Sequence, residues 1–274
     1  MEFCDLHNHS IYSDGTYTPK QLLEYAKEKG LLAIALTDHN SVDGACELEK
    51  YAKEIGVCAV VGSELTTEYL GKETHLLALF LSESAREKMK EFFKERKRLK
   101  EESNQCLAKA LNEGGYKIDY EELKKRYKNI NRAHFAKRLV ELGYVKTTKE
   151  AFDTVLKEGN GFYVSSPRPD LLSTIKWIRD IGAVPVLAHP LLSLEKEELE
   201  GLLPLAKEKG LAGFECYYRL FTKEQIQYLC ALADKYGLVK SGGSDFHGGM
   251  KDGVDMGYAS VPYEAYLELR KIVT

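Results

Sequence analysis

The sequence predicts an α/β fold, a parallel barrel of about seven strands with a set of helices inserted into it. Two observations carry this prediction. Five segments repeat one pattern, in which an amphipathic helix ends in glycine and a short apolar run with a polar end follows. Residues 82–160 break this rhythm and contain helical patterns only.

The five repeats place a glycine where each helix should end, and glycine lets the backbone turn left-handed there without a steric cost. These glycines are Gly30, Gly56, Gly182, Gly210 and Gly237. The predicted strands are the apolar runs after them, the opening FCDLHNH and the run HLLALFL. This alternation is typical of a parallel barrel or a doubly wound sheet, and the barrel is favoured.

The strand that begins at His75 departs from the alternation, because the segment between Glu64 and His75 has no helical pattern. A hairpin through Leu70-Gly71-Lys72 is expected to bring His75 back beside Glu64. The barrel is therefore not expected to be fully parallel.

The insertion begins with a long charged helix (EKMKEFFKERKRLKEESNQCLAKALNEGG) and continues with helical segments at residues 118–127, 131–144 and 149–157. It carries 20 Lys and Arg residues against 14 Asp and Glu residues, a difference of +6. We expect a barrel domain at residues 1–81 and 161–274 and a small helical cap domain at residues 82–160. Asp170 is expected to cap the helix with which the barrel resumes.

Composition limits the class of protein. The chain has 274 residues, 44% of them hydrophobic, and a net charge of −3, so bulk electrostatic binding to long nucleic acid is not expected. The N-terminus lacks the pattern of a signal peptide, and no apolar run reaches membrane-spanning length. The six cysteines, with no C-x-x-C pair, are expected to be reduced core residues of a cytoplasmic protein.

Histidines and carboxylates gather where the predicted strands end, which is where barrel proteins carry their functional groups. Six of the seven histidines lie at strand termini, a concentration that packing alone does not explain. The residues are His7, His9, His39, Glu64, His75, His189, Asp245 and His247, with Asp14 in a nearby Ser13-Asp14-Gly15 turn. Mixed imidazole and carboxylate ligands without thiolate suit Mn²⁺, Zn²⁺ or Fe, so the set predicts two or three divalent metal ions.

Taken singly, these residues are open to structural interpretations as well. An Asp before Gly, such as Asp14, is often only a turn residue. Asp38 could orient a metal ligand or simply cap the next helix. Glu64 ends the apolar run VCAVVG, where a carboxylate is costly unless cations surround it. The convergence of all of them on strand ends favours metal binding.

These residues resemble the motifs of the PHP (polymerase and histidinol phosphatase) phosphoesterases, namely DLHNHS with SDG, TDHN, GSE, the histidine of HLL, AHP and GSDFHG. The resemblance covers nearly the whole chain. It is closest to stand-alone enzymes with an inserted helical domain, which resemble nucleoside 3′,5′-bisphosphate phosphatases and 5′–3′ exonucleases acting on short RNA. It implies a distorted (β/α)7 barrel that holds up to three metals.

The resemblance also implies how the ligands divide. One ion would be bound by His7, His9, Glu64 and Asp245, a second by Glu64, His75 and His189, and a third by Asp14, His39 and His247.

Substrate contacts are implied by two further stretches. Arg132 and His134 in RAHFA resemble an R-P-H-F-A stretch that reaches phosphate from the cap, although Ala133 replaces its proline. Arg168 in Ser166-Pro167-Arg168 resembles a basic turn that follows the insertion. Near ECYY the subgroup often carries a histidine, where this chain has Phe221.

The predicted function is hydrolysis of phosphomonoester or phosphodiester bonds of nucleotides, either nucleoside 3′,5′-bisphosphates or 5′-phosphorylated short oligonucleotides. A hydroxide that bridges two ions would attack phosphorus in line, with His39, His247 and Asp14 as catalytic residues near the leaving oxygen. Two alternatives stay open. The same metals would support a small-molecule phosphatase, for example one acting on histidinol phosphate, and the chain could be a non-catalytic metal-stabilised module. No membrane and no long duplex is expected as a partner.

Overall fold

The computed structural model describes residues 2–127, 130–157, 159, 162–163, 167–248 and 254–273, and the chain divides into two compact units. Unit 1 comprises Met1–Glu91 and Arg168–Thr274, and unit 2 comprises Phe92–Pro167. The first boundary falls inside helix α3 (Glu83–Glu113) rather than before it. Ala85 and Met89, in the first turns of that helix, are fully buried.

The strands of unit 1 form two sheets. The first has the order β3-β2-β1-β9 and the second β4-β5-β6-β7-β8. The strands are β1 (Phe3–Asn8), β2 (Ala33–Leu36), β3 (Cys58–Val61), β4 (Ser63–Tyr69), β5 (Lys72–Leu79), β6 (Val184–Leu187), β7 (Gly213–Tyr218), β8 (Val239–Gly243) and β9 (Val261–Pro262). The pairs β1–β2, β2–β3, β6–β7 and β7–β8 are parallel, whereas β1–β9, β4–β5 and β5–β6 are antiparallel.

The strands are not joined into one continuous ladder among the described residues, unlike those of the expected barrel. Isolated parallel bridges, Asn8–Phe246 and His39–Glu64, connect residues of the two sheets at the strand ends. Both sheets also contribute to one apolar core. Leu6 and Val60 of the first sheet belong to the same buried cluster as Leu77 and Val186 of the second. The two sheets therefore enclose a common interior.

The hairpin expected before His75 is confirmed. Leu70 and Gly71 both have positive φ, 51° and 72°, as a tight two-residue turn requires. The register pairs Thr66 with His75 and Glu64 with Leu77, so Glu64 and His75 lie on the same face. The antiparallel strand that results makes the sheet mixed, as the sequence predicted.

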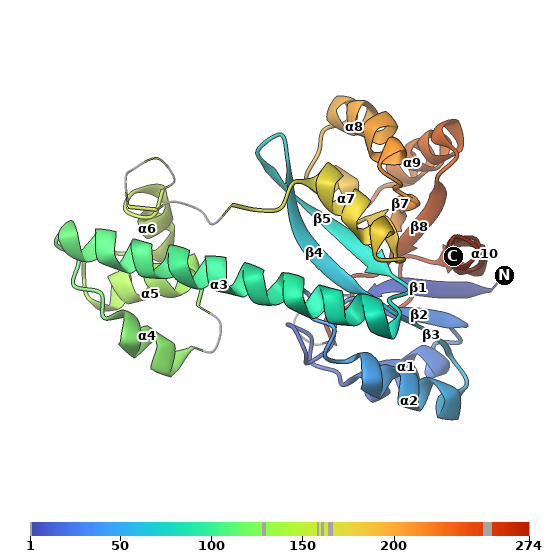
Figure 1. Cartoon of the computed structure of the whole chain (residues 1–274), viewed down its shortest axis with the longest axis horizontal. Coiled ribbons are helices and arrows are strands. Elements are labelled where there is room, and N and C mark those ends of the chain that lie inside the picture. Colours follow the sequence, from blue (N-terminus) through green and yellow to red (C-terminus); the bar gives the residue numbers. More distant parts are fainter. Residues whose placement is uncertain are drawn as a thin grey trace. The chain divides into compact units, whose positions relative to one another are not determined.

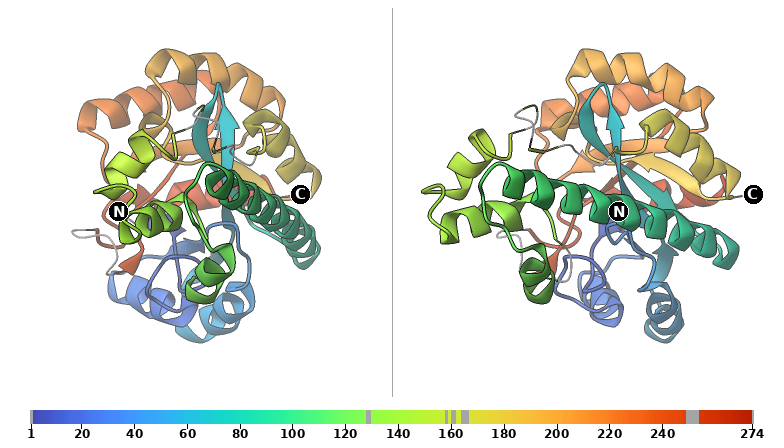
Figure 2. Two further views of the ribbon diagram at one scale, coloured as in Figure 1. Left: turned by 90° about the vertical axis from the view of Figure 1, so that its left-hand side faces the viewer. Right: turned by 60° about the vertical axis from the view of Figure 1, so that its left-hand side comes forward.

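The helices of unit 1 follow their strands as the repeats indicated. They are α1 (Pro19–Glu28), α2 (Ala45–Ile55), α7 (Leu171–Asp180), α8 (Lys196–Glu208), α9 (Lys223–Tyr236) and α10 (Tyr263–Arg270), with a 3-10 turn, η1, at Pro190–Leu192. All five repeat glycines have positive φ. Asp170 caps α7 by accepting a hydrogen bond from Ser173 N at 2.8 Å. Helices α1 and α2 lie on one side of the strands, and α8 and α9 on the other (Figure 1 and Figure 2).

Unit 2 is helical. Its helices are the later turns of α3, α4 (Tyr120–Arg126), α5 (Arg132–Glu141) and α6 (Thr148–Asp153). They pack around a separate apolar core that includes Leu111, Phe135 and Leu139, all fully buried. The last helix ends earlier than the expected residue 157.

The cysteines depart from expectation in part. None forms a disulfide among the described residues, and Cys4 and Cys216 are buried. Cys46, Cys58 and Cys106 are exposed, so the expectation that all six are core residues is wrong. Cys46 and Cys106 lie on helix surfaces and Cys58 on the edge strand β3. No helix in the described ranges is long and apolar enough to cross a membrane.

The close approach of β8 to β1 depends on a missing side chain. A Cβ atom on Gly243 would lie 2.3 Å from His7 Cβ and 2.6 Å from His7 N. We expect Gly243→Ala to lower the free energy of unfolding by about 1–3 kcal/mol, because the added methyl group overpacks this contact. Urea unfolding in the presence of a chelator measures the effect without a contribution from metal.

Gly201→Ala is the control for this variant. Gly201 lies in α8, and a Cβ there meets no atom within 4 Å. Its stability should be unchanged or higher by up to about 1 kcal/mol, because alanine favours helix over glycine. Equal unfolding midpoints for the two variants would contradict the account of the β1–β8 contact.

Candidate metal centre

The polar side chains at the strand ends of unit 1 converge on one site. Their donor atoms form three groups, and within each group the atoms lie within 4.8 Å of one another. The first group is His7, His9, Glu64 and Asp245, the second is Glu64, His75 and His189, and the third is His9, Asp14, His39 and His247. All the residues that the sequence assigned to metal are thus together, and His9 also belongs to the third group.

Glu64 lies where the groups meet, because five imidazoles contact its carboxylate. The distances are 2.8 Å to His75 Nδ1 and 3.2 Å to His189 Nε2 from Oε1, and 3.2 Å to His7 Nε2, 3.3 Å to His9 Nε2 and 3.1 Å to His39 Nδ1 from Oε2. Burial opposes ionisation, but the histidines outweigh it and hold the pKa of Glu64 well below its usual range. The side chain is therefore a carboxylate that can bridge two ions.

Asp245, just after β8, completes the first group. Its Oδ1 lies 3.2 Å from His9 Nε2 and 3.7 Å from His7 Nε2. Its Oδ2 accepts a hydrogen bond from Tyr218 OH at 2.9 Å. Burial raises the pKa of Asp245, but His9 and His7 more than compensate, so the pKa is lowered. The hydrogen bond from Tyr218 fixes the orientation of this carboxylate.

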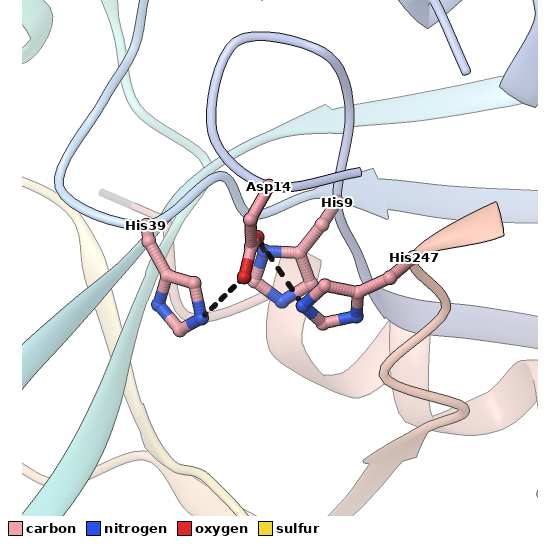
Figure 3. Close-up of side chains that lie close together, drawn as sticks. All are labelled: His9, Asp14, His39 and His247. Carbon is pink, nitrogen blue, oxygen red and sulfur yellow. Dashed lines mark ion pairs between the residues drawn. The ribbon is translucent and has the colours of Figure 1, made fainter. Parts of the chain in front are cut away.

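Asp14 joins the third group from a turn (Figure 3). Its Oδ1 lies 3.3 Å from His247 Nε2, and its Oδ2 lies 3.9 Å from His39 Nε2. The turn is tight at Gly15, where a Cβ would lie 2.3 Å from His9 O. The turn interpretation and the ligand interpretation of Asp14 are therefore compatible, because the turn is what directs its carboxylate to the histidines.

Asp38 holds the loop that carries Asp14. Its carboxylate accepts hydrogen bonds from Ser10 N at 2.7 Å, Ser10 Oγ at 2.7 Å and Ser13 Oγ at 2.6 Å. The helix-cap interpretation of Asp38 is wrong, whereas its interpretation as a residue that orients a ligand agrees with these contacts, because Ser13 directly precedes Asp14. Within the described residues Asp38 neither contacts the His39 ring nor caps α2, which begins with no side-chain cap. Its carboxylate oxygens accept hydrogen bonds from the hydroxyls of Ser10 and Ser13 instead.

Two buried carboxylates that the sequence analysis did not assign support the ligands. Glu215 Oε1 lies 2.9 Å from His7 Nδ1, and Glu215 Oε2 accepts a hydrogen bond from His189 N at 2.6 Å. Asp5 accepts hydrogen bonds from Ser244 N at 3.0 Å and from Gly257 N at 2.7 Å. A carboxylate inside an apolar strand was the signal used for Glu64, and it applied equally to Glu215.

The donor set fits divalent ions. Several buried atoms that could bind metal make no hydrogen bond of suitable geometry among the described residues, although some of them lie close to one another. They include His7 Nε2, both ring nitrogens of His9, Glu64 Oε2, His189 Nδ1 and His247 Nε2. Each such atom costs about 1–3 kcal/mol if left unsatisfied. Imidazole nitrogens and carboxylate oxygens without thiolate are ligands for Mn²⁺, Zn²⁺ or Fe. Bound ions would satisfy these atoms together.

Arg168 lies at the edge of the β4–β5 hairpin. Its Nη2 is 2.8 Å from Glu73 Oε2, and Glu73 Oε1 lies 3.3 Å from His75 Nε2. The guanidinium is thus linked to a residue of the second group through one carboxylate. Ser166 of the same predicted turn lies outside the described residues.

The other two expected substrate residues belong to unit 2. The Arg132 guanidinium lies over the Tyr163 ring at 4.2 Å. His134 Nδ1 accepts a hydrogen bond from Asn131 N at 3.1 Å, which completes the cap of α5. Burial lowers the pKa of His134 from its ordinary value. Ala133 occupies the first turn of α5, so the absence of proline does not prevent this helix from forming.

A cavity of about 290 Å³ opens at the metal centre. Five of the residues that line it belong to the donor groups: His39, Glu64, His75, His189 and Asp245. The others are Leu192, Tyr218, Arg219 and Leu220. Phe221 does not line it, because its ring packs against Tyr218 at 5.2 Å. Arg219 had no predicted role, because an arginine after an apolar strand matches no motif.

The site and fold agree with comparisons to known proteins. The model of the PHP domain family matches residues 5–164, and the chain belongs to this family. A 5′–3′ exoribonuclease from Haemophilus influenzae is 31% identical over 89% of this chain and 89% of its own length. A 3′,5′-nucleoside bisphosphate phosphatase from Chromobacterium violaceum is 28% identical over 94% of this chain and 92% of its own length.

A solved structure shares the fold throughout. A protein classed as a metal-dependent phosphoesterase, from Bifidobacterium adolescentis, matches 100% of this chain and 97% of its own chain with a TM-score of 0.74 and 26% identity. The family recognised from the strand-end motifs is thereby confirmed.

Glu215 provides a test of how the ligands are held. Its two oxygens accept hydrogen bonds from two different groups, whereas a glutamine has only one accepting oxygen. We expect Glu215→Gln to weaken metal binding roughly 10- to 100-fold, as loss of a partner behind a ligand does. Competition with a chromophoric chelator measures the affinity.

Glu208→Gln is the matched control, because Glu208 is an exposed residue paired only with Lys209 in the described structure. Its metal affinity should equal that of the wild type. Unchanged affinity in Glu215→Gln would mean that His7 and His189 are oriented without this carboxylate.

Proposed function

We propose that this protein is a metal-dependent phosphoesterase that hydrolyses phosphomonoester or phosphodiester bonds of nucleotides, with nucleoside 3′,5′-bisphosphates and 5′-phosphorylated short oligonucleotides as substrates. The observation that carries the proposal is the set of three donor groups beside a cavity. Glu64 belongs to the first and second groups, and His9 belongs to the first and third. The names of the exoribonuclease and bisphosphate phosphatase relatives support the substrate class.

Under this proposal two or three divalent ions, Mn²⁺, Zn²⁺ or Fe, occupy the three groups. When bound, such ions lower the pKa of water towards neutrality and neutralise charge on a phosphoryl group. Glu64 serves two groups at once, through oxygens that face different histidines. Tyr218 and Glu215 keep the ligands in place, and burial excludes bulk water from His7, His9, Glu64 and Asp245.

His39, His247 and Asp14 are the proposed catalytic residues on the leaving-group side. Burial lowers the pKa of His39 to about 4, so near pH 7 its ring is neutral and can offer a lone pair. Asp14 is ionised, since the interactions with His247 and His39 overcome the effect of burial and lower its pKa. Half of the Asp14 side chain is exposed, which leaves this edge of the site open to substrate.

Unit 2 is proposed to act as a helical cap, and the two sheets of unit 1 as the wall of one distorted barrel. Residues 82–160 carry an excess of positive charge, which suits a phosphorylated ligand. Arg132 and His134 are the residues of the cap assigned to phosphate, and Arg168 is assigned to it from the hairpin edge.

The proposal is tested by release of phosphate or mononucleotide from adenosine 3′,5′-bisphosphate, a 5′-phosphorylated short RNA and histidinol phosphate. We expect Mn²⁺-loaded protein to turn over the nucleotides, chelation to abolish turnover and added Mn²⁺ to restore it, because the donor groups need ions to act. Turnover of histidinol phosphate alone would favour a small-molecule phosphatase. A chelator that lowers the melting temperature of a protein inactive on all three would favour a metal-stabilised module.

Asp14→Ala and His189→Ala should each lower kcat for the nucleotide more than about 100-fold, because removing only a partner of a ligand costs about 10- to 100-fold. Asp234→Ala is the control, since Asp234 is an exposed residue paired with Lys240. Full activity in either ligand variant would contradict the assignment of its group.

The cap assignment is tested separately. Arg132→Ala should raise KM for the short RNA roughly 10-fold and leave kcat unchanged, as expected when a charged hydrogen bond to a non-reacting phosphoryl oxygen is lost. Arg98→Ala, whose guanidinium is exposed and paired with Glu95, is the matched control in the same unit. An equal KM in the two variants would remove Arg132 from the substrate site.

A further inference from the structure

We infer that Arg219, together with Leu192 and Leu220, forms a second substrate subsite beside the metal centre, and that this subsite binds the non-reacting phosphate of a nucleotide that carries two phosphates. The inference rests on the proposed function and deepens it. It identifies the residues that bind the part of the substrate next to the reacting bond.

Arg219 lies in the cavity without a hydrogen-bond or ion-pair partner among the described residues. It follows β7 directly and lines the same cavity as Glu64 and His189. Its side chain makes no ion pair or hydrogen bond with the part of the chain that the structure describes, and its Nε is buried without a partner. A buried donor on a charged group costs free energy unless an acceptor is supplied, so an acceptor from a ligand is the simplest means of satisfying it.

Two other arginines of unit 1 differ in this respect. Arg168 is paired with Glu73, and Arg86 is paired with Glu49 at 2.9 Å. Their charges are thus compensated by the protein. The guanidinium of Arg219 is uncompensated in the described structure and stands among the metal-group residues of the cavity, which is the arrangement expected of an anion-binding residue.

The aromatic ring of Tyr218 connects Arg219 to the metal centre. The guanidinium carbon lies 5.7 Å from the centre of that ring, within range of a cation–π interaction. The Tyr218 hydroxyl in turn donates its hydrogen bond to Asp245. One residue therefore orients both a metal-group carboxylate and the arginine, which fixes the distance between the reacting phosphate and a second anion.

Two exposed leucines indicate what lies between the two anions. Leu192 and Leu220 line the same cavity and are 51% and 57% exposed. Their apolar surface suits the ribose or base of a nucleotide rather than a second cluster of charge. Ligand pockets typically measure about 300–1,000 Å³, so a cavity of about 290 Å³ suits one nucleotide and not several.

The Arg219 guanidinium would bind a nucleotide with two phosphates more tightly than a simple phosphomonoester. The ions, when bound, take the reacting phosphoryl group, so Arg219 is left for the phosphate on the other side of the ribose. A nucleoside bisphosphate, or the 5′-terminal nucleotide of a short oligonucleotide, presents two phosphates in this way. A small monoester such as p-nitrophenyl phosphate presents one.

The test compares adenosine 3′,5′-bisphosphate with p-nitrophenyl phosphate in Mn²⁺-loaded wild type, Arg219→Ala and Arg219→Lys. p-Nitrophenyl phosphate is measured as a substrate or, where it is not turned over, as a competitive inhibitor. We expect Arg219→Ala to raise KM for the bisphosphate roughly 10- to 100-fold, the cost of a lost charged hydrogen bond. The KM or inhibition constant for p-nitrophenyl phosphate should stay within about twofold of the wild-type value. Arg219→Lys should recover part of the affinity for the bisphosphate.

Arg270→Ala is the matched control, because Arg270 is an exposed residue of α10 outside the cavity, and it should behave as wild type. Metal content and melting temperature show whether each variant is folded and loaded. If Arg219→Ala does not fold, Arg219→Gln gives the same comparison with more of the side chain retained.

The outcomes separate the two proposals. Equal shifts for both ligands, or no shift for either, in a folded variant of an active enzyme would overturn the role of Arg219 alone. A wild type that turns over no nucleotide would refute the proposed function, and the inference with it.

Discussion

The site depends on one constraint, the burial of the Glu64 carboxylate among five imidazoles. Glu64 is the second residue of β4 in the second sheet, but its backbone is bonded to the segment that follows β2 of the first sheet. Its N donates to Thr37 O at 3.1 Å, and Asn40 N donates to Glu64 O at 2.9 Å. Glu64 is therefore both part of a bridge between the two sheets and the centre of the metal site. The pairing of the sheets at this point also brings the ligands together.

The backbone near the ligands is held in unusual conformations. His189 and Asp245 have positive φ values of 25° and 53°, in a region that costs of order 1–3 kcal/mol for residues other than glycine. Asp5 and Glu215 bond to these segments at Ser244 N and His189 N. The buried carboxylates thus offset strain that directs the ligand side chains inward, and this explains why carboxylates with no place in the donor groups are fully buried.

The metal groups and the residues around the cavity have different consequences for function. Under the proposed function the donor groups act on the bond that is hydrolysed, and relatives of this chain carry different names, a 5′–3′ exoribonuclease and a 3′,5′-nucleoside bisphosphate phosphatase. Beside the donor groups, Arg219 and Leu220 of the turn after β7 line the cavity, and the Phe221 ring packs against Tyr218. We therefore infer that this short turn contributes to substrate choice.

The sequence by itself determined the repeat of helices and strands, the hairpin before His75 and the identity of the donor residues. These follow from local rules, because a glycine that ends a helix and a polar residue that ends an apolar strand act over a few residues. The tertiary structure alone decided that the strands form two sheets, that Asp38 bonds the serines of a neighbouring loop, and that Glu215 reaches His7. It also decided that Arg219 has no hydrogen-bond or ion-pair partner in the described structure. Each of these depends on contacts between segments far apart in the chain, and no local pattern specifies which acceptor a buried donor will meet.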